Sequence, residues 1–110
     1  MNKDRLMVYK MFDCKCAYCG EKLKSNFHID HTDPKYRGGK DDKENKFPAC
    51  PRCNIRKSVF TIEQFRHEIS EQVNRLRRNS NQFRLAESFN QIKETNAPVI
   101  FWFEKYKDTI

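Results

Sequence analysis

Two pairs of cysteines constrain the fold of this chain more than any other feature of its sequence. Cys16 and Cys19 form one C-x-x-C pair, and Cys50 and Cys53 form the second. The tight turn inside each pair aims two sulfurs at one point, and two such turns supply the four soft ligands of a tetrahedral zinc site. Because four thiolates fill the coordination shell, we expect this zinc to be structural, bracing a chain of only 110 residues.

Cys14 is a fifth cysteine close to the first pair. It is an alternative ligand to Cys16, but its spacing to Cys19 is longer than that of the usual pair, so we favour Cys16. Paired cysteines are more typical of metal ligands in a reducing compartment than of disulfides. The N-terminus lacks the pattern of a secretory signal, and no apolar run approaches the roughly 20 residues of a membrane span. We therefore expect a cytoplasmic protein with no membrane partner.

The charge of the chain predicts a polyanionic partner. Its 22 Lys and Arg against 15 Asp and Glu give a formal net charge of +7 and a pI near 9.3. An excess of this kind favours binding to nucleic acid or, as a second possibility, to an anionic membrane surface.

The 30 residues between the two cysteine pairs contain a strand that follows a polar segment at 21–26. Apolar and polar side chains alternate over residues 27–30, which predicts a strand with Phe27 and Ile29 in the core. The same alternation points His28 and Asp30 toward a site.

A long loop, a second strand and a helix are expected to follow. Residues 32–43 have the proline, glycine and charge content of a functional loop. Residues 45–49 are expected to return as a strand beside the first. Pro51 suits the first position of a helix, so a helix is predicted to begin there.

The order and spacing of polar residues inside this frame resemble a known family. The pattern C-x-x-C, D-H, G-G, N, C-x-x-C-N-x-x-K is similar to that of the HNH endonucleases of the ββα-metal, or His-Me finger, type, in the subgroup with a four-cysteine zinc. The resemblance covers residues 16–57, with Asp30-His31, Gly38-Gly39, Asn45 and Asn54 between or beside the cysteines. Asn54 stands where the family has His or Asn, a departure from the literal name.

The resemblance implies a role for each of these positions. His31 is expected to be the general base that takes a proton from water. Asp30 and Asn54 are expected to hold one catalytic divalent ion, and Asn45 to hold the loop and orient His31. Two oxygen ligands suit Mg²⁺ or Mn²⁺, which keep bound waters and accept phosphate oxygens. The expected products carry a 5′-phosphate and a 3′-hydroxyl.

The residue types support this chemistry without the family. Imidazole titrates near neutral pH and can activate water, while a hard cation acts as a Lewis acid on a phosphate. Taken alone, an Asp-His dipeptide is usually a surface turn, and Asn45 and Asn54 read as ordinary turn and helix residues. It is their combination within the cysteine frame that favours catalysis.

Basic side chains around the loop and the helix are expected to neutralise DNA phosphates. The set is Arg37, Lys40, Arg56 and Lys57. Lys57 lies three residues after Asn54 on the same helix face, which places it within reach of the scissile phosphate. Any single lysine is more simply a solvated residue, and Asp41, Asp42 and Glu44 dilute the positive charge of the loop.

Outside this region the sequence predicts mainly helices. Residues 3–13 suit a short helix, and Thr61 with Gln64 forms a capping box for a longer one. A further short helix is expected near residues 83–89. The apolar run at 99–103 predicts a buried strand.

The expected architecture is therefore α+β within a single domain. A small ββα-metal core with a Cys₄ zinc site is predicted at 14–58. A short N-terminal helix precedes it, and a mainly helical C-terminal extension follows at 59–110.

The function we expect is metal-dependent endonucleolytic hydrolysis of DNA phosphodiester bonds. One ββα site suits one strand, so a monomer is expected to nick and a homodimer to cut both strands, and the sequence leaves both open. Small members of the family are often encoded by phages or mobile elements, which would place the protein in a host cytoplasm. The alternatives are a non-catalytic zinc module that binds nucleic acid and a zinc-stapled protein-interaction subunit. Neither needs Asp30, His31 and Asn54 together.

Overall fold

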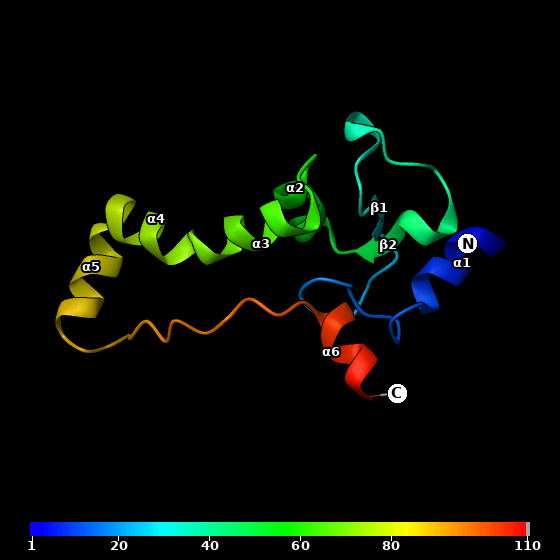
Figure 1. The fold of residues 1–110 in the computed structure, drawn as a ribbon. Helices are drawn as coiled ribbons and strands as arrows, with labels where there is room; N and C mark the ends of the chain where they lie inside the picture. Colours follow the sequence, from blue (N-terminus) through cyan, green and yellow to red (C-terminus); the bar gives the residue numbers. More distant parts are fainter. Residues whose placement is uncertain (110) are drawn as a thin grey trace. The chain divides into compact units, whose positions relative to one another are not determined.

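The computed structural model describes residues 1–109, and the chain divides into two compact units (Figure 1). The first unit comprises residues 1–65 and the C-terminal residues from Ile100 on, and the second comprises residues 66–99. These boundaries differ from those of the predicted core at 14–58 and extension at 59–110. That the chain folds as a single domain stays a prediction. None of the described helices has the length and apolar character needed to cross a membrane.

Helix α1 spans Lys3–Lys10 and is the N-terminal helix that the sequence predicts. Asn2 caps it, because its side-chain oxygen accepts a hydrogen bond from the Arg5 N–H at 2.8 Å. The helix contacts strand β2. The chain then turns through Asp13 and Cys14, both with positive φ, and enters the first cysteine pair.

Gly20 closes the turn of this first pair in the left-handed conformation. Its φ is +78°, a value that residues with a side chain rarely adopt. Its N–H donates to the Cys16 carbonyl at 3.0 Å. A Cβ at this position would make an ordinary contact with Trp102, 3.4 Å from its Cβ, so it is the backbone conformation that favours glycine here.

Strands β1 (His28–His31) and β2 (Lys46–Ala49) form the predicted pair and run antiparallel. Their register places His31 opposite Lys46. The loop between them contains two short 3₁₀ helices, η1 (Lys35–Arg37) and η2 (Lys43–Asn45).

The faces predicted for β1 are partly wrong. Phe27 is buried as expected, but Asp30 is buried as well, whereas Ile29 is only half-buried. The alternation predicts that Asp30 lies outside the core, but a buried cationic partner allows its carboxylate to be buried.

Helix α2 (Pro51–Lys57) follows β2 and completes the ββα arrangement (Figure 1). Pro51 occupies the first turn, as predicted. Cys50 precedes it as the N-cap, and its sulfur accepts a hydrogen bond from the Cys53 N–H at 3.4 Å. Because α2 also contacts β1, the two strands and the helix of the predicted core are confirmed.

A cluster of aromatic rings forms much of the core of the first unit. Tyr18 makes edge-to-face contacts with Phe65 and Phe101, with ring centroids 5.2 and 5.3 Å apart. Phe47 packs against Phe103 at 4.9 Å. The cluster joins the first cysteine turn to β2, to the start of α3 and to the C-terminal segment.

The strand predicted at 99–103 is wrong. Residues 99–101 have no regular structure, and helix α6 spans Trp102–Thr109. The Glu104 side chain accepts a hydrogen bond from the Phe101 N–H at 2.9 Å, which caps the helix, and the Trp102 N–H donates to the Tyr18 carbonyl at 3.0 Å. The apolar side chain of Phe101 is buried among aromatic rings instead of within a sheet.

Helix α3 (Ile62–Ser70) begins with the predicted capping box. The Thr61 N–H donates to the Gln64 side chain at 2.9 Å, and the Gln64 N–H donates to the Thr61 hydroxyl at 3.2 Å. α3 runs from the first unit into the residues of the second.

The second unit continues with helices α4 (Gln72–Asn79) and α5 (Asn81–Ser88), which contact each other. The apolar residues at 62, 65, 69, 73 and 76 recur at helical spacing and predict one helix, where the structure has α3 and α4 as separate helices. Ser70 and Gln72 donate side-chain hydrogen bonds to helix carbonyls at the interruption. Ser80 caps α5 by accepting from the Phe83 N–H at 3.1 Å.

Candidate functional site

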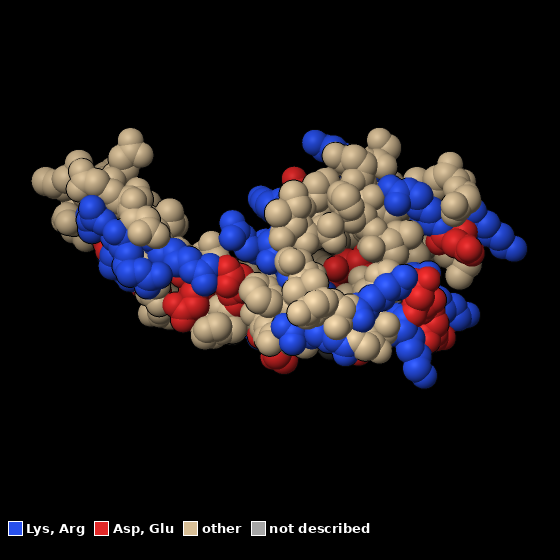
Figure 2. Space-filling view, turned by 90° about the horizontal axis from the view of Figure 1, so that it is seen from above, with Lys and Arg blue, Asp and Glu red and all other residues tan. Residues whose placement is uncertain are grey.

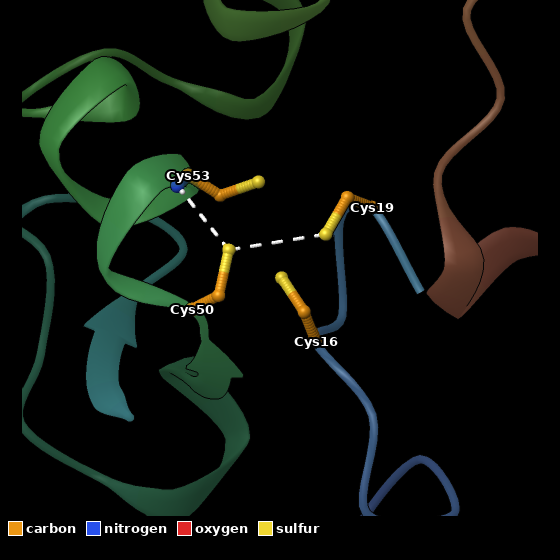
Figure 3. Close-up of side chains that lie close together, drawn as sticks. All are labelled: Cys16, Cys19, Cys50 and Cys53. Carbon is orange, nitrogen blue, oxygen red and sulfur yellow. Dashed lines mark hydrogen bonds between the residues drawn. The ribbon is translucent and has the colours of Figure 1, made fainter. Parts of the chain in front are cut away.

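The four paired cysteines converge on one point (Figure 3). The sulfurs of Cys16, Cys19, Cys50 and Cys53 all lie within 4.8 Å of one another. A tetrahedral zinc with bonds of about 2.3 Å has sulfur–sulfur edges of roughly 3.8 Å. The Cys19 and Cys50 sulfurs are 3.8 Å apart, so the spacing and the donor type fit a tetrahedral metal ion. The preference for Cys16 over Cys14 is confirmed.

The thiols of this cluster restrict one another's ionisation. A hydrogen bond from Cys16 holds the pKa of Cys19 well below its ordinary value, and the same bond raises the pKa of Cys16 to about 11. Hydrogen bonding to Cys16 is also the main reason that the pKa of Cys53 is raised. One thiolate is therefore favoured without a metal, and a bound cation is what favours loss of the remaining protons.

A second site is a cleft of about 250 Å³ lined by β1, η1 and the end of α2. Asp30 and His31 reach it from β1, and Asn54 reaches it from α2. Three of the four residues predicted to act in catalysis therefore line one cavity. Asn45 is not among its lining residues.

Asp30 is held by two buried side chains. The Lys57 ammonium lies 3.0 Å from Oδ2 of Asp30, and the Tyr18 hydroxyl donates to the same oxygen at 2.5 Å. Burial first, and the negative charge of Asp30 second, raise the pKa of Tyr18 far above its ordinary value, so the hydroxyl remains a donor. Because both contacts use Oδ2, Oδ1 of Asp30 is the oxygen left for a cation.

The structure corrects the expectation that Lys57 contacts a DNA phosphate. Its side chain is 0% exposed, and besides Asp30 it binds the His31 carbonyl oxygen at 3.0 Å. A lysine can lay its aliphatic stem against α2 and turn its ammonium inward when a carboxylate is there to meet it. Lys57 thus links α2 to two consecutive residues of β1.

His31 is half-buried and bonded to an acidic residue of the loop. Its Nε2 lies 2.8 Å from Oδ1 of Asp41. Asp41 also pairs with Lys46 at 3.2 Å and with Lys35 at 3.5 Å. The hydrogen bond from His31, followed by that from Lys46, holds the pKa of Asp41 well below its usual range.

Asn45 ties the two ends of the loop together. Its side-chain oxygen accepts from the Thr32 hydroxyl and from the Asp33 N–H, both at 2.7 Å. Its amide nitrogen donates to the carbonyls of Asp33 at 2.8 Å and Lys40 at 2.7 Å. These contacts agree with a loop-holding residue, while the orientation of His31 by Asn45 stays a prediction.

The other basic residues predicted to meet DNA are on the surface. Arg37, Lys40 and Arg56 are exposed, and Arg37 donates from Nε to the Val59 carbonyl at 2.6 Å. Figure 2 shows Lys and Arg side chains spread over the visible face with Asp and Glu among them. A role in DNA binding stays a prediction for these residues.

Sequence reasoning missed the partners of Asp30 and His31. Tyr18 is 12 residues from Asp30, and Asp41 is 10 residues from His31. No periodicity connects residues at these separations across a turn or an irregular loop. Asp41 is visible in the sequence only as one of several acidic loop residues.

The cysteine and cleft residues both lie within a segment that matches a known family. Residues 16–60 match the family model described as HNH endonuclease. The resemblance of this segment to the HNH endonucleases is confirmed. The matched residues include the paired cysteines, Asp30, His31, Asn45 and Asn54.

A curated relative supports the same assignment. The chain is 36% identical over 66 residues to the protein named "SPbeta prophage-derived putative HNH endonuclease YoqL" from Bacillus subtilis (strain 168). The alignment covers 49% of this chain and 27% of that relative, so the chain spans about a quarter of the relative's length. No solved structure matches the chain at a significant level.

Proposed function

We propose that this protein is a metal-dependent HNH endonuclease that hydrolyses DNA phosphodiester bonds. The observation that carries the proposal is the single cleft lined by Asp30, His31 and Asn54 within the matched segment. Each of these side chains has a use in phosphodiester hydrolysis, and a purely structural zinc module has no use for the three together.

Asp30 and Asn54 are the residues that would hold a divalent ion. A carboxylate and an amide oxygen are hard donors, and they fit Mg²⁺ or Mn²⁺ better than zinc, which prefers sulfur and nitrogen. The ion would supply positive charge at the phosphate oxygens, where negative charge grows in the transition state. Lys57 and Tyr18 fix Oδ2 of Asp30 and so set the direction of Oδ1.

His31 is the general base in this proposal. Its ring takes a proton from a water molecule as the water oxygen forms a bond to phosphorus. The bond from phosphorus to the 3′ oxygen breaks, and that oxygen takes up a proton from solvent. The products carry a 5′-phosphate and a 3′-hydroxyl.

The four cysteines are proposed to hold a structural zinc. The thiolate set is closed and leaves no open position for substrate. Cys50 and Cys53 lie at the start of the helix that carries Asn54 and Lys57. The metal would therefore fix α2, and with it one wall of the cleft, without touching the substrate.

The substrate and setting are proposed from the charge of the chain and from its relative. The net charge of +7 suits DNA, and the exposed Arg37, Lys40 and Arg56 border the elements that line the cleft. The prophage origin in the relative's name is consistent with a phage-encoded protein acting in a host cytoplasm. One cleft per chain predicts nicking by a monomer and double-strand cleavage by a homodimer.

The test is conversion of supercoiled plasmid to nicked or linear DNA by purified protein with Mg²⁺ or Mn²⁺. The parent protein is expected to cut, and chelation of the divalent ion or the change His31→Ala is expected to abolish cutting. Equal cutting by the His31→Ala protein would contradict the assignment of the base. Binding of DNA without cutting by either protein, across both metals, would favour the alternative of a non-catalytic zinc module.

A further inference from the structure

We propose that Asp41 is a positioning residue that fixes the tautomer and the direction of the His31 ring, so that Nδ1 of His31 is the atom that accepts the proton. This inference deepens the proposed function and rests on His31 being the general base. The observation behind it is the 2.8 Å contact between Nε2 of His31 and Oδ1 of Asp41.

The contact assigns the donor and the acceptor. An ionised carboxylate can only accept hydrogen bonds, and Asp41 is held ionised at neutral pH by its three cationic or donating neighbours. The proton of the contact therefore sits on Nε2 of His31. A neutral imidazole carries only one ring proton, which leaves the lone pair on Nδ1.

The loop has a built geometry that brings Asp41 to His31. Asn45 fastens the loop at Asp33 and at Lys40, the residue directly before Asp41. Gly39 allows the close approach inside this closure, since a Cβ there would lie 1.7 Å from the Asp33 carbonyl oxygen. Asn45 therefore acts on His31 through the loop and Asp41, which gives a physical route for the orientation predicted from the sequence.

The charges around the pair also favour this role. The register of the sheet places Lys46 opposite His31, and Lys46 and Lys35 both pair with Asp41. Without Asp41, two ammonium groups would remain close to a ring that must become positive when it takes a proton. Asp41 separates these charges from the ring.

Stability alone does not account for the contact. Asp41 is 56% exposed, and ion pairs at such positions are screened by water and contribute little to folding. The contact has a clearer use if His31 is a general base. A histidine that is free to rotate or to exchange tautomers presents the wrong nitrogen to the water for part of the time, and the hydrogen bond to Asp41 prevents this.

The experiment compares the parent, Asp41→Asn and Asp42→Asn proteins. Asp42 is exposed on the same loop and makes no side-chain capping bond, so its change matches the charge and size change at Asp41. The first readout is steady-state cleavage of a DNA duplex with Mg²⁺ or Mn²⁺. The second is the tautomer of His31 from ring-nitrogen NMR at alkaline pH, where imidazoles are neutral.

For Asp41→Asn we expect kcat to fall by roughly 10- to 100-fold with little change in KM. This fall is smaller than the whole rate enhancement of roughly 10²- to 10⁴-fold that a general base supplies, because His31 itself remains. Parental His31 is expected to carry its proton on Nε2, and the Asp41→Asn protein to show a mixture of tautomers. Asp42→Asn is expected to match the parent in both readouts.

Two results overturn the inference and leave the proposed function in place. One is a parent protein that cuts while Asp41→Asn cuts equally well or faster. The other is a parental His31 with its proton on Nδ1. A parent protein that cuts no DNA overturns the proposed function and the catalytic role of Asp41 together, and the NMR readout then reports the pair by itself.

Discussion

The two units differ in burial. Among the residues whose burial is described, every buried side chain belongs to the first unit, at 1–65 or from Ile100 on. No side chain in residues 66–99 is buried. The first unit combines an aromatic core, a buried ion pair and a thiol cluster. The second unit relies on helix caps and half-buried ion pairs. The buried contacts of the chain are therefore concentrated in the unit that holds the cleft residues. We expect the second unit to unfold locally with a smaller free energy than the first.

Removal of the metal is the largest perturbation that we expect. Structural zinc contributes apparent binding energies of roughly 10–16 kcal/mol in zinc-finger peptides, so chelation should unfold most of the first unit. Trp102 is the only tryptophan of the sequence, and it packs on Gly20 in the first cysteine turn. Its fluorescence is expected to shift to that of a solvated indole, and the helical signal in circular dichroism is expected to fall as well, because helices as short as α4 and α5 are marginal without a packed core.

Cysteine variants separate the metal from other effects of a chelator. Cys53→Ser is expected to reproduce the change in Trp102 fluorescence and to lower the zinc content. Cys14→Ser is the matched control, because Cys14 lies outside the four-sulfur cluster. Equal zinc loss from both variants would contradict the assigned ligand set.

Loss of the buried ammonium is the next largest effect. Lys57→Met leaves Asp30 buried without its cation, which typically costs about 3–5 kcal/mol. Urea unfolding followed by Trp102 fluorescence measures this cost. Adding Asp30→Asn to the variant is expected to restore part of it, because the uncompensated charge is then gone.

Lys40→Met is the matched control for this change. Lys40 is exposed, and its contact with Asn45 is made by the backbone carbonyl, so a small effect on the urea midpoint is expected. If Lys57→Met were as mild as Lys40→Met, the first unit would not depend on the buried pair.

The smallest effect is expected in the second unit. Arg77 binds both carboxylate oxygens of Glu87 at 2.9 and 2.7 Å and one of Glu94 at 2.8 Å. The hydrogen bonds from Arg77 lower the pKa of Glu87 in the folded state. The stability that this shift contributes is fully present above the ordinary glutamate pKa of about 4.3, and it is lost as pH falls through the lowered folded value.

Thermal melts of Arg77→Met test this pH dependence. The variant is expected to melt slightly below the parent at neutral pH, and the difference is expected to shrink at acid pH as Glu87 is protonated. Arg78→Met changes the neighbouring exposed arginine and serves as the control. A difference between parent and Arg77→Met that grows on acidification would contradict the assigned role of the ion pair.

Local patterns predicted the elements of the ββα core and the metal ligands, because each of these features has its own signal. The alternation before His31, the proline after Cys50 and the doubled C-x-x-C spacing each report structure within a few residues. The capping box at Thr61 and Gln64 was predictable for the same reason.

Features decided by tertiary contacts were not predictable in this way. The run at 99–103 is apolar enough for a strand, but aromatic packing and the Glu104 cap start a helix there. A lysine is expected at the surface because its side chain is charged, but Lys57 is buried because it pairs with Asp30. The pairing of Asp41 with His31 depends on how Asn45 closes the loop, and no local pattern encodes that closure.

The most direct test of the central claim is single-turnover cleavage of a defined, end-labelled DNA duplex by the His31→Ala and His28→Ala proteins. Both histidines lie on β1, but His28 is exposed and is not among the residues that line the cleft. Our account predicts that His28→Ala cuts at about the parental rate to leave 5′-phosphate ends, and that His31→Ala is slower by roughly 10²–10⁴, the contribution of a general base. Equal rates for the two variants would contradict the account.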